Sequence, residues 1–152
     1  MRVCGVEMKG SEAILCLLAI DSGLFDIPDC RTVRLPLLKD QDSEQMKKFQ
    51  FVFAKLAEDY KIDTFVIRER PQKGKFAGGA VGFKMEAALQ LLPDVKTEIL
   101  TSSFIKEQLA RHPVPIVFKE TGLKGFQETA FITAYAYSVS YTHLRAHETK
   151  AN

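Results

Sequence analysis

The sequence has few features that would place it in a specialised structural class. It contains only three cysteines, Cys4, Cys16 and Cys30, with no CxxC spacing, which argues against a disulfide framework or a thiolate metal site. The longest apolar run, Ala13 to Ile20, is too short to span a bilayer, and the N-terminus lacks the layout of a signal peptide. We therefore expect a cytoplasmic protein without membrane association, whose cysteines are small buried hydrophobic residues.

The chain also lacks an excess of charge and the common nucleotide-binding motifs. Its net charge is +2, so any affinity for nucleic acid must come from local clusters of Lys and Arg. No GxxxxGK(S/T) or GxGxxG pattern occurs, so neither a P-loop nor a dinucleotide-binding Rossmann domain is supported. With 152 residues, 46% of them apolar and 26% charged, the chain has the composition of one ordinary globular domain.

The C-terminal segment 139–152, VSYTHLRAHETKAN, differs in character from the rest of the chain. It has neither apolar periodicity nor helix caps, and it closely resembles a translated sequencing-adaptor sequence found at the ends of predicted reading frames. We therefore expect one domain over residues 1–138 and treat 139–152 as a non-native tail. Without this tail the only histidine is His112, so a histidine-based metal site has almost no material.

Hydrophobic patterning predicts an α/β fold. Two apolar runs joined by residues 9–12 predict an antiparallel hairpin, because Gly10 can take the positive φ of a tight turn. Asp42 and Ser43 can cap a helix whose apolar residues recur at helical spacing. The expected strands are Arg2–Met8, Ala13–Ile20, Cys30–Leu37, Thr64–Ile67 and Val95–Leu100, and the expected helices are 43–60, Phe83–Leu92, 101–110 and Gly125–Tyr137, with 21–29 as a loop. This order predicts a mixed five-stranded sheet with helices on both faces.

Three glutamates occupy positions that suit metal-dependent chemistry. Glu7 lies in the first expected strand, Glu69 follows the strand 64–67, and Glu128 lies in the last expected helix. Carboxylate oxygens are the ligands that Mg²⁺ and Mn²⁺ prefer. Acids brought together from two strand ends and one helix would form a site that activates water and stabilises a phosphoryl transition state. The alternative is that they are three unrelated surface glutamates.

The segment 68–84 combines basic residues with glycine. Its glycines allow backbone N–H groups to approach a phosphate chain, and its cations supply attraction, so the segment predicts a nucleic-acid contact. Phe76 is a candidate for stacking on a base. The alternative is a solvated loop in which an ion pair to Arg68 or Arg70 occupies Glu69. The basic residues and glycines of this segment are Arg68, Arg70, Lys73, Lys75, Lys84, Gly74, Gly78, Gly79 and Gly82.

These features together resemble the ribonuclease H-like superfamily, and within it the RuvC-type Holliday-junction resolvases. The opening Val3–Glu7 is similar to that family's hydrophobic-x-Gly-hydrophobic-Asp motif, and Glu69 with the basic loop and residues 82–88 resembles its second motif. Residues 102–106 are similar to a Pro-x-x-hydrophobic-Lys element without the proline, and residues 128–134 to the terminal Asp-Ala-hydrophobic-Ala helix. The chain as far as Ser138 also resembles a small bacterial family described only as a domain of unknown function.

The resemblance implies a ribonuclease H-like α/β fold and a metal-dependent nuclease that acts on branched DNA or a hybrid duplex, as a homodimer like the resolvases. Glu7, Glu69 and Glu128 would be both catalytic residues and ligands of Mg²⁺ or Mn²⁺. The nucleic-acid contacts implied by the basic loop and the resemblance are Arg68, Arg70, Lys73, Lys75, Phe76, Lys84 and Lys106.

Two departures from the resolvase pattern keep other interpretations open. The resolvases use Asp at the first and last acidic positions and carry a second Asp on the final helix, where this chain has Phe131 or Gly125. The extra methylene of Glu7 and Glu128 moves a carboxylate by about 1 Å, and such a displacement can cost roughly 10²-fold in rate. A second hypothesis is therefore a nucleic-acid-binding or protein-interaction module that has lost the chemistry. A third is an α/β domain whose glutamates are incidental.

Overall fold

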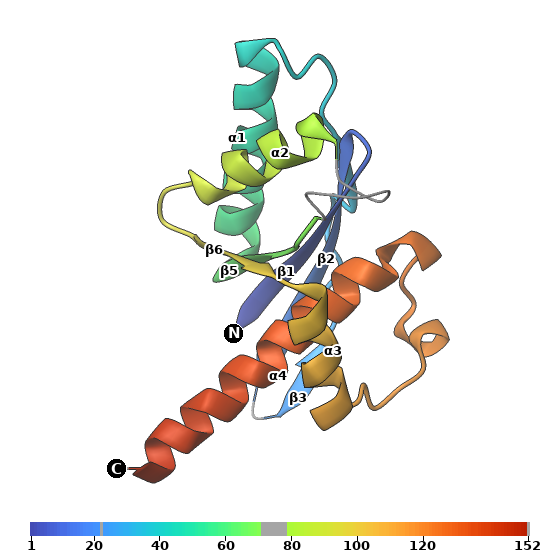
Figure 1. The fold of residues 1–152 in the computed structure, drawn as a ribbon, viewed down its shortest axis with the longest axis vertical. Coiled ribbons are helices and arrows are strands. Elements are labelled where there is room, and N and C mark those ends of the chain that lie inside the picture. Colours follow the sequence, from blue (N-terminus) through green and yellow to red (C-terminus); the bar gives the residue numbers. More distant parts are fainter. Residues whose placement is uncertain (22, 71–78, 152) are drawn as a thin grey trace.

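The computed structural model describes residues 1–21, 23–70 and 79–151, with side chains described as far as Tyr141. These residues form one six-stranded mixed sheet with helices on both of its faces (Figure 1). The strands are β1 Arg2–Lys9, β2 Glu12–Asp21, β3 Leu24–Asp26, β4 Arg34–Pro36, β5 Thr64–Arg68 and β6 Lys96–Leu100. The helices are α1 Ser43–Tyr60, α2 Ala80–Gln90, α3 Ser102–Arg111 and α4 Glu128–Ala151, with 3₁₀ turns at Phe118–Thr121 and Gly125–Gln127.

β1 is the central strand of the sheet. The strand order is β3-β2-β1-β5-β6, and β4 also pairs with β2. β1 pairs antiparallel with β2 and parallel with β5, and in the parallel register Val6 is the partner of Ile67. The carboxyl ends of β1 and β5 therefore meet at one edge of the sheet, with Glu7 and Arg68 following that last matched pair.

The predicted elements are confirmed in the centre of the sheet and differ at its edge. The expected third strand Cys30–Leu37 is shortened to β4, and β3 lies inside the segment 21–29, which the sequence predicted to be a loop. β3 has no alternating pattern to reveal it, because Leu24 is 78% exposed and the strand exists through its pairing with residues 19–21 of β2.

The bounds of α2 and α4 also differ from the prediction. α2 begins three residues before the expected Phe83, because its N-cap, Gly79, has no side chain that signals a cap in the sequence. α4 extends past Tyr137 as far as Ala151. That residues 139–152 are a non-native tail stays a prediction.

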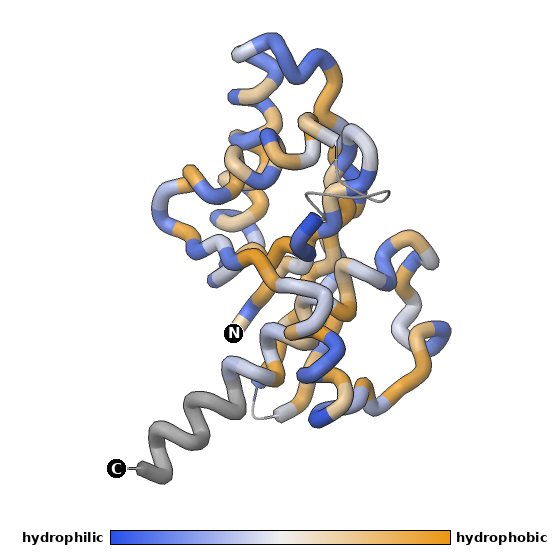
Figure 2. The backbone as a smooth tube through the Cα atoms, viewed as in Figure 1, coloured by the Kyte–Doolittle hydropathy of each residue, from blue (hydrophilic) through white to orange (hydrophobic). Residues whose placement is uncertain are grey.

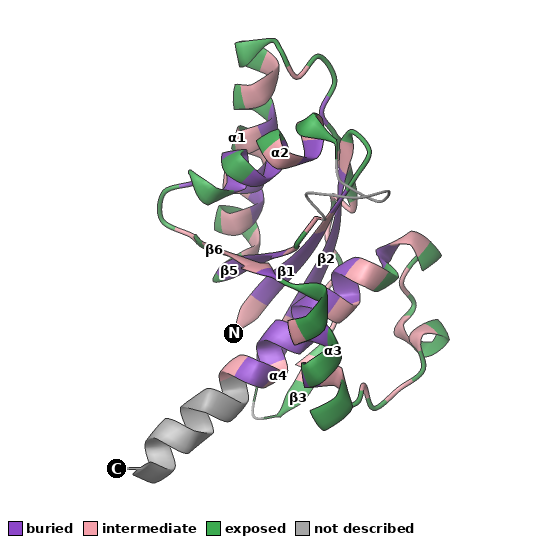
Figure 3. Cartoon of the chain, in the orientation of Figure 1, coloured by how far each residue is buried: buried purple, intermediate pink, exposed green. Residues whose placement is uncertain are grey.

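The sheet separates two hydrophobic cores. Alternate residues of β1 face opposite layers, so Cys4, Val6 and Met8 pack with α1 and α2, whereas Val3 packs with α4. The burial colours in Figure 3 and the hydropathy colours in Figure 2 both mark the middle of the sheet as buried and apolar. Within the part of the chain that the structure describes, no helix is long and apolar enough to cross a membrane.

α4 crosses β1 at Gly5. A Cβ atom at this position would overlap the backbone carbonyl oxygen of Ala130 and would lie 3.0 Å from the Cβ of Ala134. The absence of a side chain at Gly5 therefore allows the helix backbone to lie directly on the strand. Glu7 follows two residues later on the same face, so the first turn of α4 is brought to the end of β1.

We predict that Gly5→Ala destabilises the fold by about 1–3 kcal/mol or more, because the added methyl group meets backbone atoms that cannot move without displacing α4. Urea denaturation followed by circular dichroism measures the effect. Gly125→Ala is the matched control, since a Cβ there meets no described atom within 4 Å, and its effect should stay within about 0.5 kcal/mol. Equal stability of the two variants would contradict the close approach.

Candidate functional site

Glu7 is a half-buried carboxylate at the carboxyl end of the central strand. Burial raises its pKa, and the positive charges of Lys9, Arg68 and Arg70 oppose that rise. The hydroxyl of Thr129, in the first turn of α4, also lowers the pKa through a hydrogen bond to the carboxylate. Glu7 is thus an acid held between the end of the sheet and the start of α4, surrounded by cations.

Arg68 is the neighbour of Glu7 on the adjacent parallel strand. Its Nη2 and Nε atoms donate to the hydroxyl of Ser102 at 2.9 Å and 3.2 Å. Ser102 is the first residue of α3, and the preceding Thr101 caps that helix by accepting a hydrogen bond from the N–H of Phe104. This contact connects the end of β5 to α3 and keeps a guanidinium close to Glu7.

Glu69 and Arg70 follow β5 at the same edge. Glu69 is exposed, and its N–H donates to the carbonyl of Leu100 at 2.8 Å, so strand pairing continues for one more residue. Arg70 is half-buried, and its Nη1 donates to the carbonyl oxygen of Met8. Its guanidinium lies against Gly82, where a Cβ atom would come within 2.5 Å of Nε. Arg70 therefore links β5, β1 and α2.

Glu86 is a fourth acid at this edge, and the sequence interpretation did not select it. It lies on α2 one turn after Gly82, and its residue exposure is 7%. Burial raises its pKa; the nearby charge of Arg70 lowers it and that of Glu69 raises it. The signal that could have revealed it is a glutamate four residues from a glycine on the apolar face of a helix.

The three predicted glutamates are not brought into one cluster. Over residues 1–21, 23–70 and 79–141, whose side chains the structure describes, no group of three His, Cys, Asp or Glu side chains is placed to hold a metal ion. Alternation along the strands explains this: Glu69 follows Phe65 and Ile67, which face α1 and α2, whereas Glu7 faces α4. Glu128 is exposed at the first residue of α4.

The carboxylates nonetheless fit a divalent cation by their chemistry. Mg²⁺ is usually held by one or two carboxylates together with water and substrate phosphates, and a closed protein cage is not required. Glu7 next to the start of α4, and Glu69 close to Glu86, each offer hard oxygen donors of this kind. The donors present therefore suit an ion that binds together with a phosphate substrate.

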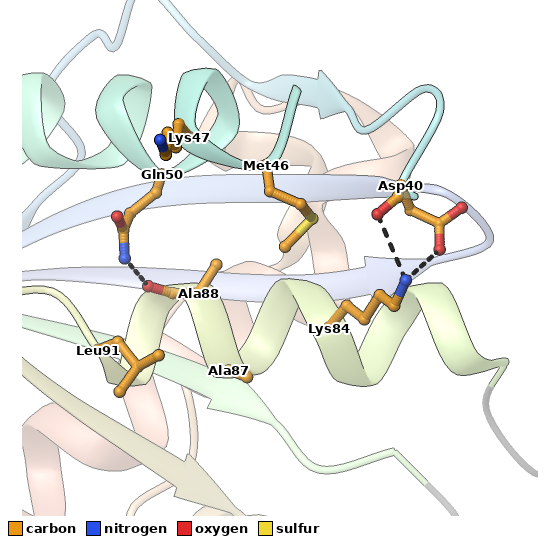
Figure 4. Close-up of a pocket in the computed structure, with 8 residues that line it drawn as sticks. All are labelled: Asp40, Met46, Lys47, Gln50, Lys84, Ala87, Ala88 and Leu91. Carbon is orange, nitrogen blue, oxygen red and sulfur yellow. Dashed lines mark hydrogen bonds and ion pairs between the residues drawn. The ribbon is translucent and has the colours of Figure 1, made fainter. Parts of the chain in front are cut away.

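The remaining predicted contacts lie in different places. Lys84 forms an ion pair with Asp40 at 2.9 Å, at one end of a groove of about 320 Å³ between α1 and α2 (Figure 4). Across that groove the side-chain amide of Gln50 donates to the carbonyl of Ala88 at 2.8 Å. Lys106 is exposed on α3. The predicted contacts Lys73, Lys75 and Phe76 lie outside the described residues.

We predict that Glu7→Gln stabilises the protein at pH 8. The folded-state pKa of Glu7 is raised, so its ionised form costs stability above that pKa, and the cost disappears as pH falls below the ordinary value of 4.5. Because the side chain is only half-buried, solvent screening should keep the gain below about 1 kcal/mol.

Urea midpoints measured from pH 8 to pH 4 test this prediction. The midpoint of Glu7→Gln should lie above that of the wild type at pH 8 and approach it at pH 4. Glu58→Gln, which changes an exposed glutamate of α1, is the matched control and should change little at either pH. A lower midpoint for Glu7→Gln at pH 8 would show that the carboxylate is stabilising.

Comparison with known proteins agrees with this architecture. The model of a family described as "Protein of unknown function (DUF3010)" matches residues 1–137. The structure of Thermus thermophilus RuvC is similar with a TM-score of 0.67 and 13% identity, over 91% of this chain and 93% of that chain. RuvC from the same organism in complex with a Holliday junction substrate gives a TM-score of 0.64 and 14% identity, with the same coverage. None of the curated proteins compared with the sequence matches it. At these identities the likeness shows the fold, which is ribonuclease H-like as the sequence resemblance predicted.

Proposed function

The chain belongs to the DUF3010 family of proteins of unknown function, and we propose that it is a divalent-metal-dependent nuclease of the resolvase type. The observation that carries the proposal is the position of Glu7. It stands at the end of the central strand of a resolvase-like fold, against the first turn of α4, within the field of Lys9, Arg68 and Arg70. An acid among cations at the meeting point of two strand ends suits the recognition of a phosphodiester together with a cation.

Each residue of the site has a role that follows from its surroundings. Glu7, next to the start of α4, and Glu69, near Glu86, would each offer a carboxylate to Mg²⁺ or Mn²⁺, with Glu128 available at the start of α4. The ion, when bound, supplies activation of water and neutralisation of charge on the phosphate. Arg68, oriented by Ser102, would contact the phosphate backbone. That one similar structure contains a Holliday junction substrate supports branched DNA as the first substrate to test.

We predict that the purified protein with Mn²⁺ cuts branched DNA or an RNA–DNA hybrid, and that Glu7→Gln and Glu69→Gln each reduce the rate by at least about 10²-fold. The amide keeps the shape of the side chain and removes the charge that attracts the cation. Cleavage of end-labelled substrates resolved on denaturing gels measures the rate. Glu58→Gln is the matched control and should cut like the wild type. Cleavage that persists in both site variants, or no cleavage of any branched, duplex or hybrid substrate, would refute the nuclease.

A second candidate function is nucleic-acid binding without cleavage, and the position of Phe131 favours it. Phe131 stands where one alignment places the second acid of the resolvases, and it is 1% exposed in the core between the sheet and α4. Its ring packs with those of Phe25, Phe118 and Tyr135 at centroid distances of 6.1 Å, 6.1 Å and 6.3 Å. That position is therefore used for packing, which leaves the final helix with fewer ligands.

For this second function we predict salt-sensitive binding that EDTA does not change. The double substitution Lys73→Ala/Lys75→Ala should weaken binding to a fluorescent junction and reduce the salt slope by about one unit for each phosphate that the protein no longer neutralises. Fluorescence anisotropy at several salt concentrations measures both quantities. Lys48→Ala/Lys55→Ala, which removes the same charge from α1, is the matched control. Absence of binding at low salt would exclude both candidate functions.

A further inference from the structure

Arg70 lies among several carboxylates at the edge of the sheet. Its charge lowers the pKa of Glu7 on β1 and also that of Glu86 on α2. Glu86 in turn lies in the field of Glu69. The guanidinium of Arg70 therefore acts on the carboxylates of Glu7 and Glu86, which belong to different elements. Its position determines how strongly it stabilises the ionised form of each.

The hydrogen bonds of Arg70 and Glu86 are incomplete where the two side chains are buried. Nη1 of Arg70 donates to the Met8 carbonyl, but Nε has no acceptor among the described residues. Oε2 of Glu86 likewise has no donor within the described part of the chain. A buried charge without a partner lowers the stability of the folded state. The buried carboxylate of Glu86 therefore has a stability cost.

The geometry of α2 places Glu86 where it can act on Arg70. Gly82 and Glu86 are four residues apart and lie on the same face of the helix. The glycine allows the guanidinium to approach the helix backbone, and the glutamate supplies a negative charge one turn further along. α2 thus offers the guanidinium a place against Gly82 and a negative charge one turn away, without a direct ion pair between the described side chains of Arg70 and Glu86.

We infer that Glu86 is a positioning residue for the acidic edge of the sheet. Its carboxylate balances the charge of Arg70 and keeps the guanidinium between the Met8 carbonyl and Gly82. Glu7 and Glu69 thereby remain available to a cation. This inference rests on the proposed function, because it assigns to Glu86 the task of preserving the cation-binding charge of the two acids.

Neutralising Glu86 should change the carboxylates with which Arg70 interacts. In Glu86→Gln the guanidinium loses its buried counter-charge, and Glu7 is the other acid whose pKa its charge lowers. It would then compete with a divalent cation for Glu7. We expect the dissociation constant for Mn²⁺ alone, measured by calorimetry on the full chain, to rise about threefold to tenfold.

A second substitution separates positioning from a general structural role. Arg70→Met in the Glu86→Gln background removes the competing cation, so affinity for Mn²⁺ should return to within about twofold of the wild type. Glu86→Asp keeps the charge and should retain most of the affinity. Loss of packing alone would lower the urea midpoint without changing the Mn²⁺ dissociation constant.

Two results would overturn the inference. One is wild-type affinity for Mn²⁺ in Glu86→Gln, and the other is failure of Arg70→Met to restore affinity in the double variant. If the wild type binds no Mn²⁺ without a substrate, cleavage of branched DNA decides on the nuclease, and urea unfolding decides on the pair. A coupled pair predicts that the double variant has a midpoint closer to the wild type than either single variant, whereas additive losses would refute the coupling.

Discussion

The contact between Gly5 and the carbonyl oxygen of Ala130 sets the geometry on which the rest of the structure depends. Because the strand has no side chain at this point, α4 lies directly on β1, and its first turn reaches the end of the strand. Thr129 can then bond to Glu7, and Gln127, just before α4, donates to the carbonyl of Leu15 on β2 at 2.9 Å. A larger residue at Gly5 would lift the helix and separate the acid from the helix start.

The central elements were predictable because local pattern and burial agree there. The hairpin of β1 and β2, the β-branched run of β5 and the capped helix α1 each bury the residues that their periodicity marks as apolar. The edge strands β3 and β4 were not predictable, because their local sequence pattern does not indicate burial. β3 and β4 are three-residue strands whose residues 24–26 and 34–36 are half-buried or exposed, so their conformation comes from pairing with β2.

The candidate site was predictable in part. Sequence motifs located Glu7 at a strand end and Glu69 after another, but they do not say which face each side chain takes. Strand alternation directs Glu7 to the layer of α4 and leaves Glu69 near Glu86 on the other layer. The sequence does not predict a role for Glu86, because a single glutamate in a helix usually faces solvent and only the folded chain places Arg70 against Gly82, one turn before it.

The edge of the sheet shows a conflict between stability and charge that is typical of functional sites. Burial raises the pKa of both Glu7 and Glu86, so two acids are kept where ionisation is unfavourable. A scaffold selected only for stability would have neutral residues at these positions, like the buried Phe131 on the final helix. The contrast is informative because both kinds of position lie against the same sheet. Phe131 belongs to an aromatic core, whereas Glu7 and Glu86 lie in the field of Arg70, which limits the cost of burying them. We propose on this basis that the charges at the end of β1 are maintained for a ligand.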